Sequence, residues 1–144
     1  MKSNRLYAWL TLAGALPFVA CALLPLVGVP SVAGLGTLDA IAGSYGLAIV
    51  CFVAGSHWGI HLSGKNTAPI NLFVSSNVIF LLTWFAWIGP VLNIAIAAQL
   101  LAIVVLWMID YRLRAAEVID NGYFQIRSAA TLIVSIALLI ILVT

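Results

Sequence analysis

Two histidines in the stretch AGSHWGIHLSG, residues 54–64, are the side chains best suited to chemistry in this sequence. His57 and His61 are four residues apart and flank Trp58, at the end of a long apolar run. Residues four apart on a helix share a face, so the two imidazoles are expected to point the same way. An imidazole can bind a metal, exchange a proton or hydrogen-bond to a ligand. Which of these three roles the pair can have depends on the helices and loops that surround it.

Four roles of the pair stay open on the sequence. The histidines can be neutral and hydrogen-bonded to another helix, or can line a cavity for a small molecule with a quinone-like headgroup. A metal site lacks a third ligand, which Asp110 would supply only if its helix packed on that of the histidines. Acid–base catalysis lacks a nearby nucleophile or carboxylate, so the sequence favours a non-enzymatic role with no metal and no catalytic residue.

Further polar side chains lie within the apolar runs. Counting from the run ends places Asn77 and Gln99 near the middle of theirs. They can form interhelical hydrogen bonds, or they can line a cavity together with the His57 face.

Pro17 lies near the middle of the first run, where it removes a backbone hydrogen bond and predicts a kink. Such a kink can open a cavity.

The composition identifies the surroundings of these residues. Of 144 residues, 65% are hydrophobic and 7% are charged, whereas a soluble domain carries about a quarter charged residues. We therefore expect the lipid bilayer to be the main partner of this chain. The net charge is +2 with six Lys and Arg residues, too few for a nucleic-acid-binding surface.

Five apolar runs predict an all-α bundle of five transmembrane helices that forms one domain over residues 1–144. They cover about 6–27, 40–62, 69–87, 90–109 and 124–144, and about 20 residues cross the hydrocarbon core as a helix. Asp39 is expected to cap the second helix, and Pro69 suits the first turn of the third. The fourth helix is expected to continue to about Val118, with a turn at 119–123. The loop at 28–38 can be re-entrant or a surface cap.

The loops predict the orientation. All six basic residues, Lys65 among them, fall on one side of these five crossings. Positively charged loops stay in the cytoplasm, so we expect a cytoplasmic N-terminus and an outer C-terminus in the bacterial inner membrane.

Two features are expected to hold helices together. Gly55 and Gly59 form a GxxxG pattern away from the histidine face, and this spacing lets a neighbouring helix approach closely. Arg127 lies about one turn inside the last run and is expected to pair with Asp110 or Asp120 as a structural brace.

The segments GALPF at 14–18, YGLAIVCFVAGSHWGIHL at 45–62 and GYFQIRSAATLIVSIAL at 122–138 occur in an order that resembles the bacterial domain-of-unknown-function family 3429. That family includes mitochondrial transmembrane protein 69. The most specific block is carried here by Tyr45, Gly46, Phe52, Gly55, His57, Trp58 and Gly59. The resemblance implies a small multi-span inner-membrane protein and adds Tyr45 and Gly46 to the candidate residues. The family position that matches His57 is sometimes Arg, which implies a donor or cation there. It implies no reaction.

Two functions follow as expectations. The first is an accessory or assembly subunit that packs on a larger membrane complex, for example a respiratory one, or on copies of itself. The second is a binder or carrier of a small hydrophobic molecule, such as a quinone, a porphyrin (haem) or a lipid, in a cavity lined by His57, Asn77 and Gln99.

Overall fold

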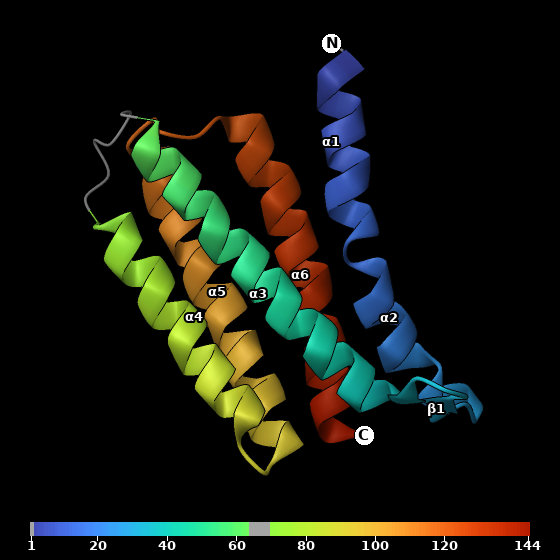
Figure 1. Cartoon of the computed structure of the whole chain (residues 1–144). Helices are drawn as coiled ribbons and strands as arrows, with labels where there is room; N and C mark the ends of the chain where they lie inside the picture. The colour runs from blue at the N-terminus through green and yellow to red at the C-terminus, as the bar shows by residue number, and fades with distance from the viewer. Residues whose placement is uncertain (1, 64–69) are drawn as a thin grey trace.

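The computed structural model describes residues 2–63 and 70–144, and it is almost entirely helical (Figure 1). Six α-helices, one 3-10 turn and one short hairpin follow in order: α1 (Lys2–Ala13), α2 (Leu16–Leu23), η1 (Pro25–Val27), β1 (Ser31–Val32), β2 (Gly36–Thr37), α3 (Leu38–Leu62), α4 (Leu72–Ile88), α5 (Leu92–Ala115) and α6 (Asn121–Val143). Apolar runs uninterrupted by charge form these helices, because a helix satisfies its own backbone hydrogen bonds in an apolar medium.

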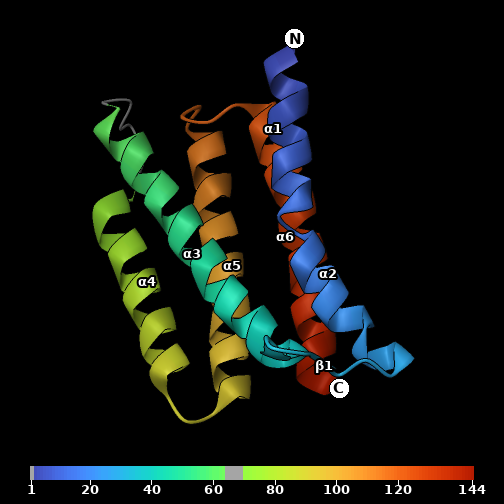
Figure 2. The same ribbon diagram turned by 45° about the vertical axis from the view of Figure 1, so that its right-hand side comes forward.

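The helices form one bundle around a shared core. Helix α3 contacts α2, α4 and α5, and α6 contacts α1, α2 and α5. The core contains Phe18, Val50, Ile96, Leu106 and Leu138, all fully buried. The chain starts at the end of the bundle where α5 connects to α6, and it finishes at the opposite end, beside the hairpin (Figures 1 and 2).

Four helical segments of the described chain are long and apolar enough to cross a membrane: Leu6–Val27, Leu38–Leu62, Leu92–Ala115 and Asn121–Val143. The fifth expected span, 69–87, corresponds to α4, which is apolar but has 17 residues. Lys65 and Pro69, to which the sequence assigned a loop charge and a first helical turn, lie outside the described residues.

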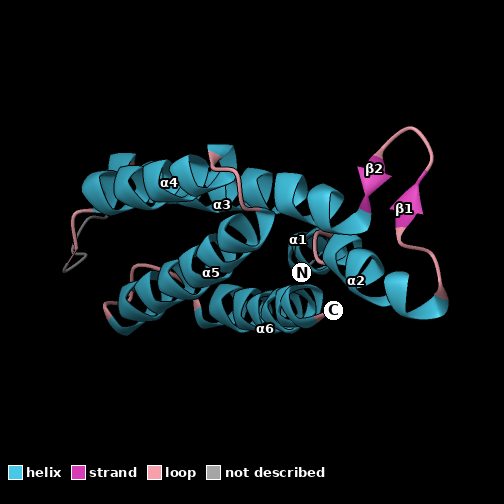
Figure 3. Ribbon diagram, turned by 90° about the horizontal axis from the view of Figure 1, so that it is seen from below, coloured by secondary structure: helices cyan, strands magenta, loops and turns pink. Residues whose placement is uncertain are grey.

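The first apolar run is divided at Gly14–Ala15, and Pro17 lies in the first turn of α2. The kink expected at this proline is therefore present as a break between two helices. The carbonyl of Gly14 accepts a hydrogen bond from the Tyr45 hydroxyl at 3.0 Å. Beyond the break α2 packs on both α3 and α6, whereas the main contact of α1 is with α6. Figure 3 shows α1 and α2 lying between α3 and α6.

Three boundaries differ from the expectation. Thr37, not Asp39, is the N-cap of α3, because the Asp39 carboxylate lies in the first turn and accepts from the Ala40 amide. Helix α5 ends at Ala115 rather than Val118, because Glu117 adopts a φ of +57°.

Of the stretch expected to be a turn, 119–123, residues 119 and 120 lie between the helices, whereas 121–123 already belong to α6, whose amides at Gly122 and Tyr123 donate to the Asp120 cap. The loop at 28–38 forms a two-stranded antiparallel hairpin that pairs Ser31 with Thr37.

Candidate functional site

A buried polar triad joins three helices at the level of His57. The Nε2 atom of His57, in α3, lies 2.9 Å from Oδ1 of Asp110, in α5. The Nε atom of Arg127, in α6, donates to the other carboxylate oxygen of Asp110 at 3.0 Å. His57 and Asp110 are 0% and 1% exposed, and the Arg127 side chain is 16% exposed. Of the two carboxylates considered for Arg127, its partner is Asp110.

The hydrogen bonds of the triad indicate the state of the imidazole. Nδ1 of His57 is buried and has no partner among the described residues. A doubly protonated ring would place an N–H there with no acceptor, and a buried unpaired donor is costly. We therefore assign a neutral ring that carries its proton on Nε2 and donates it to Asp110, an assignment from the network.

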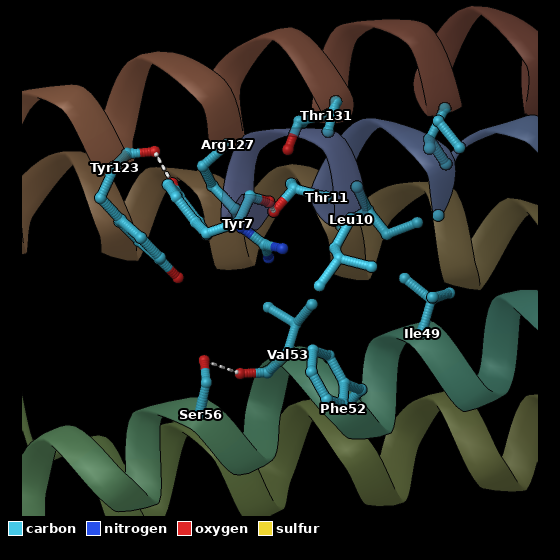
Figure 4. Close-up of a pocket in the computed structure, with 15 residues that line it drawn as sticks. Tyr7, Leu10, Thr11, Ile49, Phe52, Val53, Ser56, Tyr123, Arg127 and Thr131 are labelled. Carbon is cyan, nitrogen blue, oxygen red and sulfur yellow. Dashed lines mark hydrogen bonds between the residues drawn. The ribbon is translucent and has the colours of Figure 1, made fainter. Parts of the chain in front are cut away.

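A cavity of ≈ 460 Å³ opens beside Arg127, between α1, α3 and α6 (Figure 4). Polar side chains lie at one end, around Arg127 and Ser56, and the other end is apolar. The walls are formed by Tyr7, Leu10, Thr11, Gly14, Ala15, Ile49, Phe52, Val53, Ser56, Ile103, Tyr123, Arg127, Ala130, Thr131 and Val134. Beyond the Gly14–Ala15 break α2 packs on α3, but before it α1 packs mainly on α6. The space between α1 and α3 is therefore left open as the cavity.

Two tyrosines fix α1 to α6 at the polar end of the cavity. The Tyr7 hydroxyl donates to the carbonyl of Tyr123 at 3.1 Å, and the two rings stack with centroids 5.7 Å apart. This contact holds α1 on α6, which is the helix that α1 mainly contacts.

The cavity that the sequence predicts differs in place and in lining. His57 and Gln99 are fully buried among protein atoms, and neither belongs to the cavity wall. Asn77 is exposed on α4 and donates to the carbonyl of Phe73 at 2.8 Å, because a short amide reaches the preceding turn of its own helix. These three side chains therefore do not line one cavity.

Gln99 instead joins α5 to the start of α3. Its amide nitrogen donates to the Gly43 carbonyl at 2.7 Å, and its amide oxygen lies against Gly46. A Cβ at position 46 would collide with that oxygen, so Gly46 is a packing glycine as expected. Gly43 and His57 are separated by about 21 Å along α3 at about 1.5 Å per residue. The two polar contacts are therefore independent.

His61 and Trp58 lie at the α3–α4 contact rather than beside the triad. The His61 ring packs on Phe73 with centroids 3.9 Å apart, and the edge of Trp58 meets the same ring. Among the described residues no three His, Cys, Asp or Glu side chains gather as metal ligands would. The two histidines therefore have separate partners.

Gly55 and Gly59 make no close helix contact at their Cβ positions within the described residues. Both are exposed, and a Cβ built at either one meets nothing within 4 Å in the part of the chain that is described. The close helix approach expected through this GxxxG pattern is thus not seen among the described residues, although Gly55 lines a small pocket with Ser76 and Asn77 of α4.

The sequence analysis missed most of the cavity wall. Tyr7 and Thr11, and likewise Arg127 and Thr131, are four residues apart and share a helix face. That spacing was the available signal, but nothing in the sequence indicates that α1 and α6 lie side by side.

The comparisons with known proteins agree with the sequence resemblance. The model of the family described as "Protein of unknown function (DUF3429)" matches residues 3–143. This chain belongs to that family. No curated protein and no solved structure matches it. The membership covers the triad and the cavity, and it assigns no activity to them.

Proposed function

We propose that this member of the family is a non-enzymatic protein of the bacterial inner membrane that binds a lipophilic small molecule in the cavity beside Arg127. The observation that carries the proposal is a cavity of ≈ 460 Å³ with mainly apolar walls and one guanidinium. Sites for small molecules are usually about 300–1,000 Å³, with apolar walls and few polar groups.

The placement in the membrane supports a lipophilic ligand. Under this proposal the four long helical segments and the shorter α4 all cross the bilayer, with the N-terminus in the cytoplasm. Arg112 and Arg114 at the end of α5 favour that side for the N-terminal end of the bundle. Leu10 and Phe52 line the cavity and are 66% and 77% exposed, so its opening would face acyl chains.

The proposal is tested by filling the cavity. Thr131 lines it, while its neighbour Leu132 is 62% exposed on the outer face of α6. Thr131→Phe and the control Leu132→Phe are purified from their native membrane with a mild detergent, and bound molecules are extracted and identified by mass spectrometry. We expect one compound to accompany the unmodified chain and Leu132→Phe at near equal stoichiometry, and to fall about tenfold or more in Thr131→Phe.

Two outcomes contradict the proposal. Either no compound accompanies the unmodified chain above the level of bulk lipid, or the same compound accompanies Thr131→Phe undiminished. Equal folding of the two variants is checked by gel filtration and circular dichroism.

A second candidate function has its own observation. Gly55 and Gly59 of α3 are exposed, and among the described residues nothing lies within 4 Å of a Cβ built at either one. Small-residue faces let helices of different chains approach closely. This favours an accessory or assembly role in which the chain docks on a larger membrane complex or on a second copy.

The docking role is tested with Gly55→Leu and Gly59→Leu, against Ala97→Leu on the exposed face of α5. A partner that depends on the glycine surface would be lost from mildly purified material only in the glycine variants. Loss in none of the three, or in all three alike, contradicts docking through this surface.

A further inference from the structure

We infer that the ligand of this cavity is uncharged and presents to Arg127 an oxygen that accepts hydrogen bonds, as the carbonyl of a quinone or an ester does. The inference rests on the proposed function, since it names the chemistry of the molecule that this function requires. It is argued from charge, from the donors facing the cavity and from the shape of the wall.

The charges next to the cavity already cancel. The carboxylate of Asp110 accepts from His57 at 2.9 Å and from Arg127 at 3.0 Å, so both of its oxygens are occupied. With a neutral imidazole, the triad sums to zero. An anionic headgroup would add an uncompensated negative charge beside a buried carboxylate, and a cationic one would meet the guanidinium. Both are disfavoured where water cannot screen them.

The donors of the wall whose described contacts leave hydrogens over are the Arg127 guanidinium and the hydroxyls of Tyr123 and Thr131, and only the guanidinium is charged. The hydrogen bond of Arg127 within the described residues uses Nε, and its terminal nitrogens point into the cavity (Figure 4). Three hydroxyls of the wall already donate to backbone carbonyls: those of Tyr7, Thr11 and Ser56. A ligand oxygen that accepts from Arg127 therefore satisfies the strongest donor left without a partner.

The wall changes character along the cavity. Arg127 and Tyr7 lie at the end nearer the chain start, whereas Ala15, Ile49 and Val134 line the inner end. A molecule with one polar group and an apolar body matches this gradient. Its body would contact hydrocarbon side chains while its oxygen reaches the guanidinium.

The experiment compares four probes of similar chain length on the full chain in phosphatidylcholine nanodiscs. Decylubiquinone and dioctanoylglycerol are uncharged and carry carbonyls, decyl phosphate is an anion, and decyltrimethylammonium is a cation. Binding is measured by calorimetry for the unmodified chain, Arg127→Lys, Thr131→Phe and Leu132→Phe. Arg127→Lys keeps the positive charge beside Asp110 and removes the planar group with its two terminal nitrogens.

We expect at least one uncharged probe to bind saturably and about tenfold or more tightly than either charged probe. Thr131→Phe abolishes that binding, Leu132→Phe leaves it unchanged, and Arg127→Lys weakens it about tenfold, the loss typical of a hydrogen bond from a charged donor. The tighter of the two uncharged probes distinguishes a quinone from an ester lipid.

The results distinguish a failure of the inference about the headgroup from a failure of the proposed function. If a charged probe binds most tightly and Thr131→Phe blocks it, the headgroup inference is wrong and the cavity function stands. If an uncharged probe binds with equal affinity to Arg127→Lys, recognition by the guanidinium is wrong. If Thr131→Phe weakens no probe, the proposed function fails, and this inference fails with it. Thr131→Phe leaves the triad intact, so the test of cavity binding remains valid even if Arg127→Lys does not fold.

Discussion

Asp110 connects three helices through two hydrogen bonds to side chains that are far apart in sequence. It accepts from His57 of α3 and Arg127 of α6 while itself belonging to α5. A carboxylate that is 1% exposed would be unstable without these partners. The cation beside it is in turn kept near the core by the same contact. The triad thus links α3, α5 and α6, and removing any one of its three side chains leaves another without its hydrogen-bond partner.

Asp110→Asn is expected to lower the free energy of unfolding by about 3–5 kcal/mol, because it leaves the Arg127 guanidinium partly buried without its counter-charge. The measurement is equilibrium unfolding in mixed SDS and mild detergent micelles. Asp39→Asn, at an exposed position in the first turn of α3, is the control and should cost less than about 1 kcal/mol.

The double variant Asp110→Asn/Arg127→Gln removes both charges and should be more stable than Asp110→Asn. If the double variant is instead the sum of the two single changes, the ion pair is not the source of the loss.

Two glycines of α3 are expected to respond oppositely to alanine. At Gly46 a Cβ would collide with the amide oxygen of Gln99, so Gly46→Ala should destabilise the chain by about 1–3 kcal/mol. At Gly55 nothing lies within 4 Å, so Gly55→Ala should be neutral or stabilise by up to about 1 kcal/mol through helix propensity. The same unfolding assay measures both, and Gln99→Ala should relieve most of the cost of Gly46→Ala.

At the scale of elements, the break between α1 and α2 shapes the cavity. Pro17 has no N–H to donate to the carbonyl of Ala13, four residues earlier, and next to that position the Gly14 carbonyl accepts from the Tyr45 hydroxyl of α3. The Tyr45 ring also packs on Phe18 with centroids 5.1 Å apart. These two contacts hold the start of α2 on α3, whereas α1 packs mainly on α6.

Tyr45→Phe keeps the ring and removes the hydroxyl that holds this break. A hydrogen bond contributes about 0.5–1.5 kcal/mol, so amide exchange at residues 13–19 should accelerate about two- to tenfold. Hydrogen–deuterium exchange with peptide-level mass spectrometry measures it. Tyr111→Phe, at a half-exposed tyrosine of α5, is the matched control. Unchanged protection in Tyr45→Phe would show that packing alone fixes the break.

Helices and their approximate ends could be predicted from the sequence because apolar runs are a local signal. The break at Pro17 was predicted for the same reason. The cavity was misplaced because it depends on which helices pair, and neither run length nor polar position encodes that. Asn77 illustrates the error: its amide is near the middle of a run, yet it bonds to its own helix and faces outward.

At the scale of the whole molecule, the two chain ends lie at opposite ends of the bundle (Figure 1). The triad and the polar end of the cavity lie nearer the end where α5 connects to α6. If this end faces the cytoplasm, the guanidinium lies in the cytoplasmic part of the bilayer and the apolar end of the cavity reaches toward its centre. The proposed binding and the orientation of the chain are thus linked.

The orientation depends on whether the 17-residue α4 crosses the bilayer. At about 1.5 Å per residue it is about 25 Å long, which is at the short end of what can span. Alkaline phosphatase fusions after Ser63, Gly89 and Ala116 decide the matter, because the enzyme folds only outside the cytoplasm. With five crossings and a cytoplasmic N-terminus, only the Gly89 fusion of these three is active, and a fusion after Thr144 is active as well. Equal activity after Ser63 and Gly89 would mean that α4 does not cross, which would place His57 and Asp110 at opposite surfaces and contradict the triad as well as the five crossings.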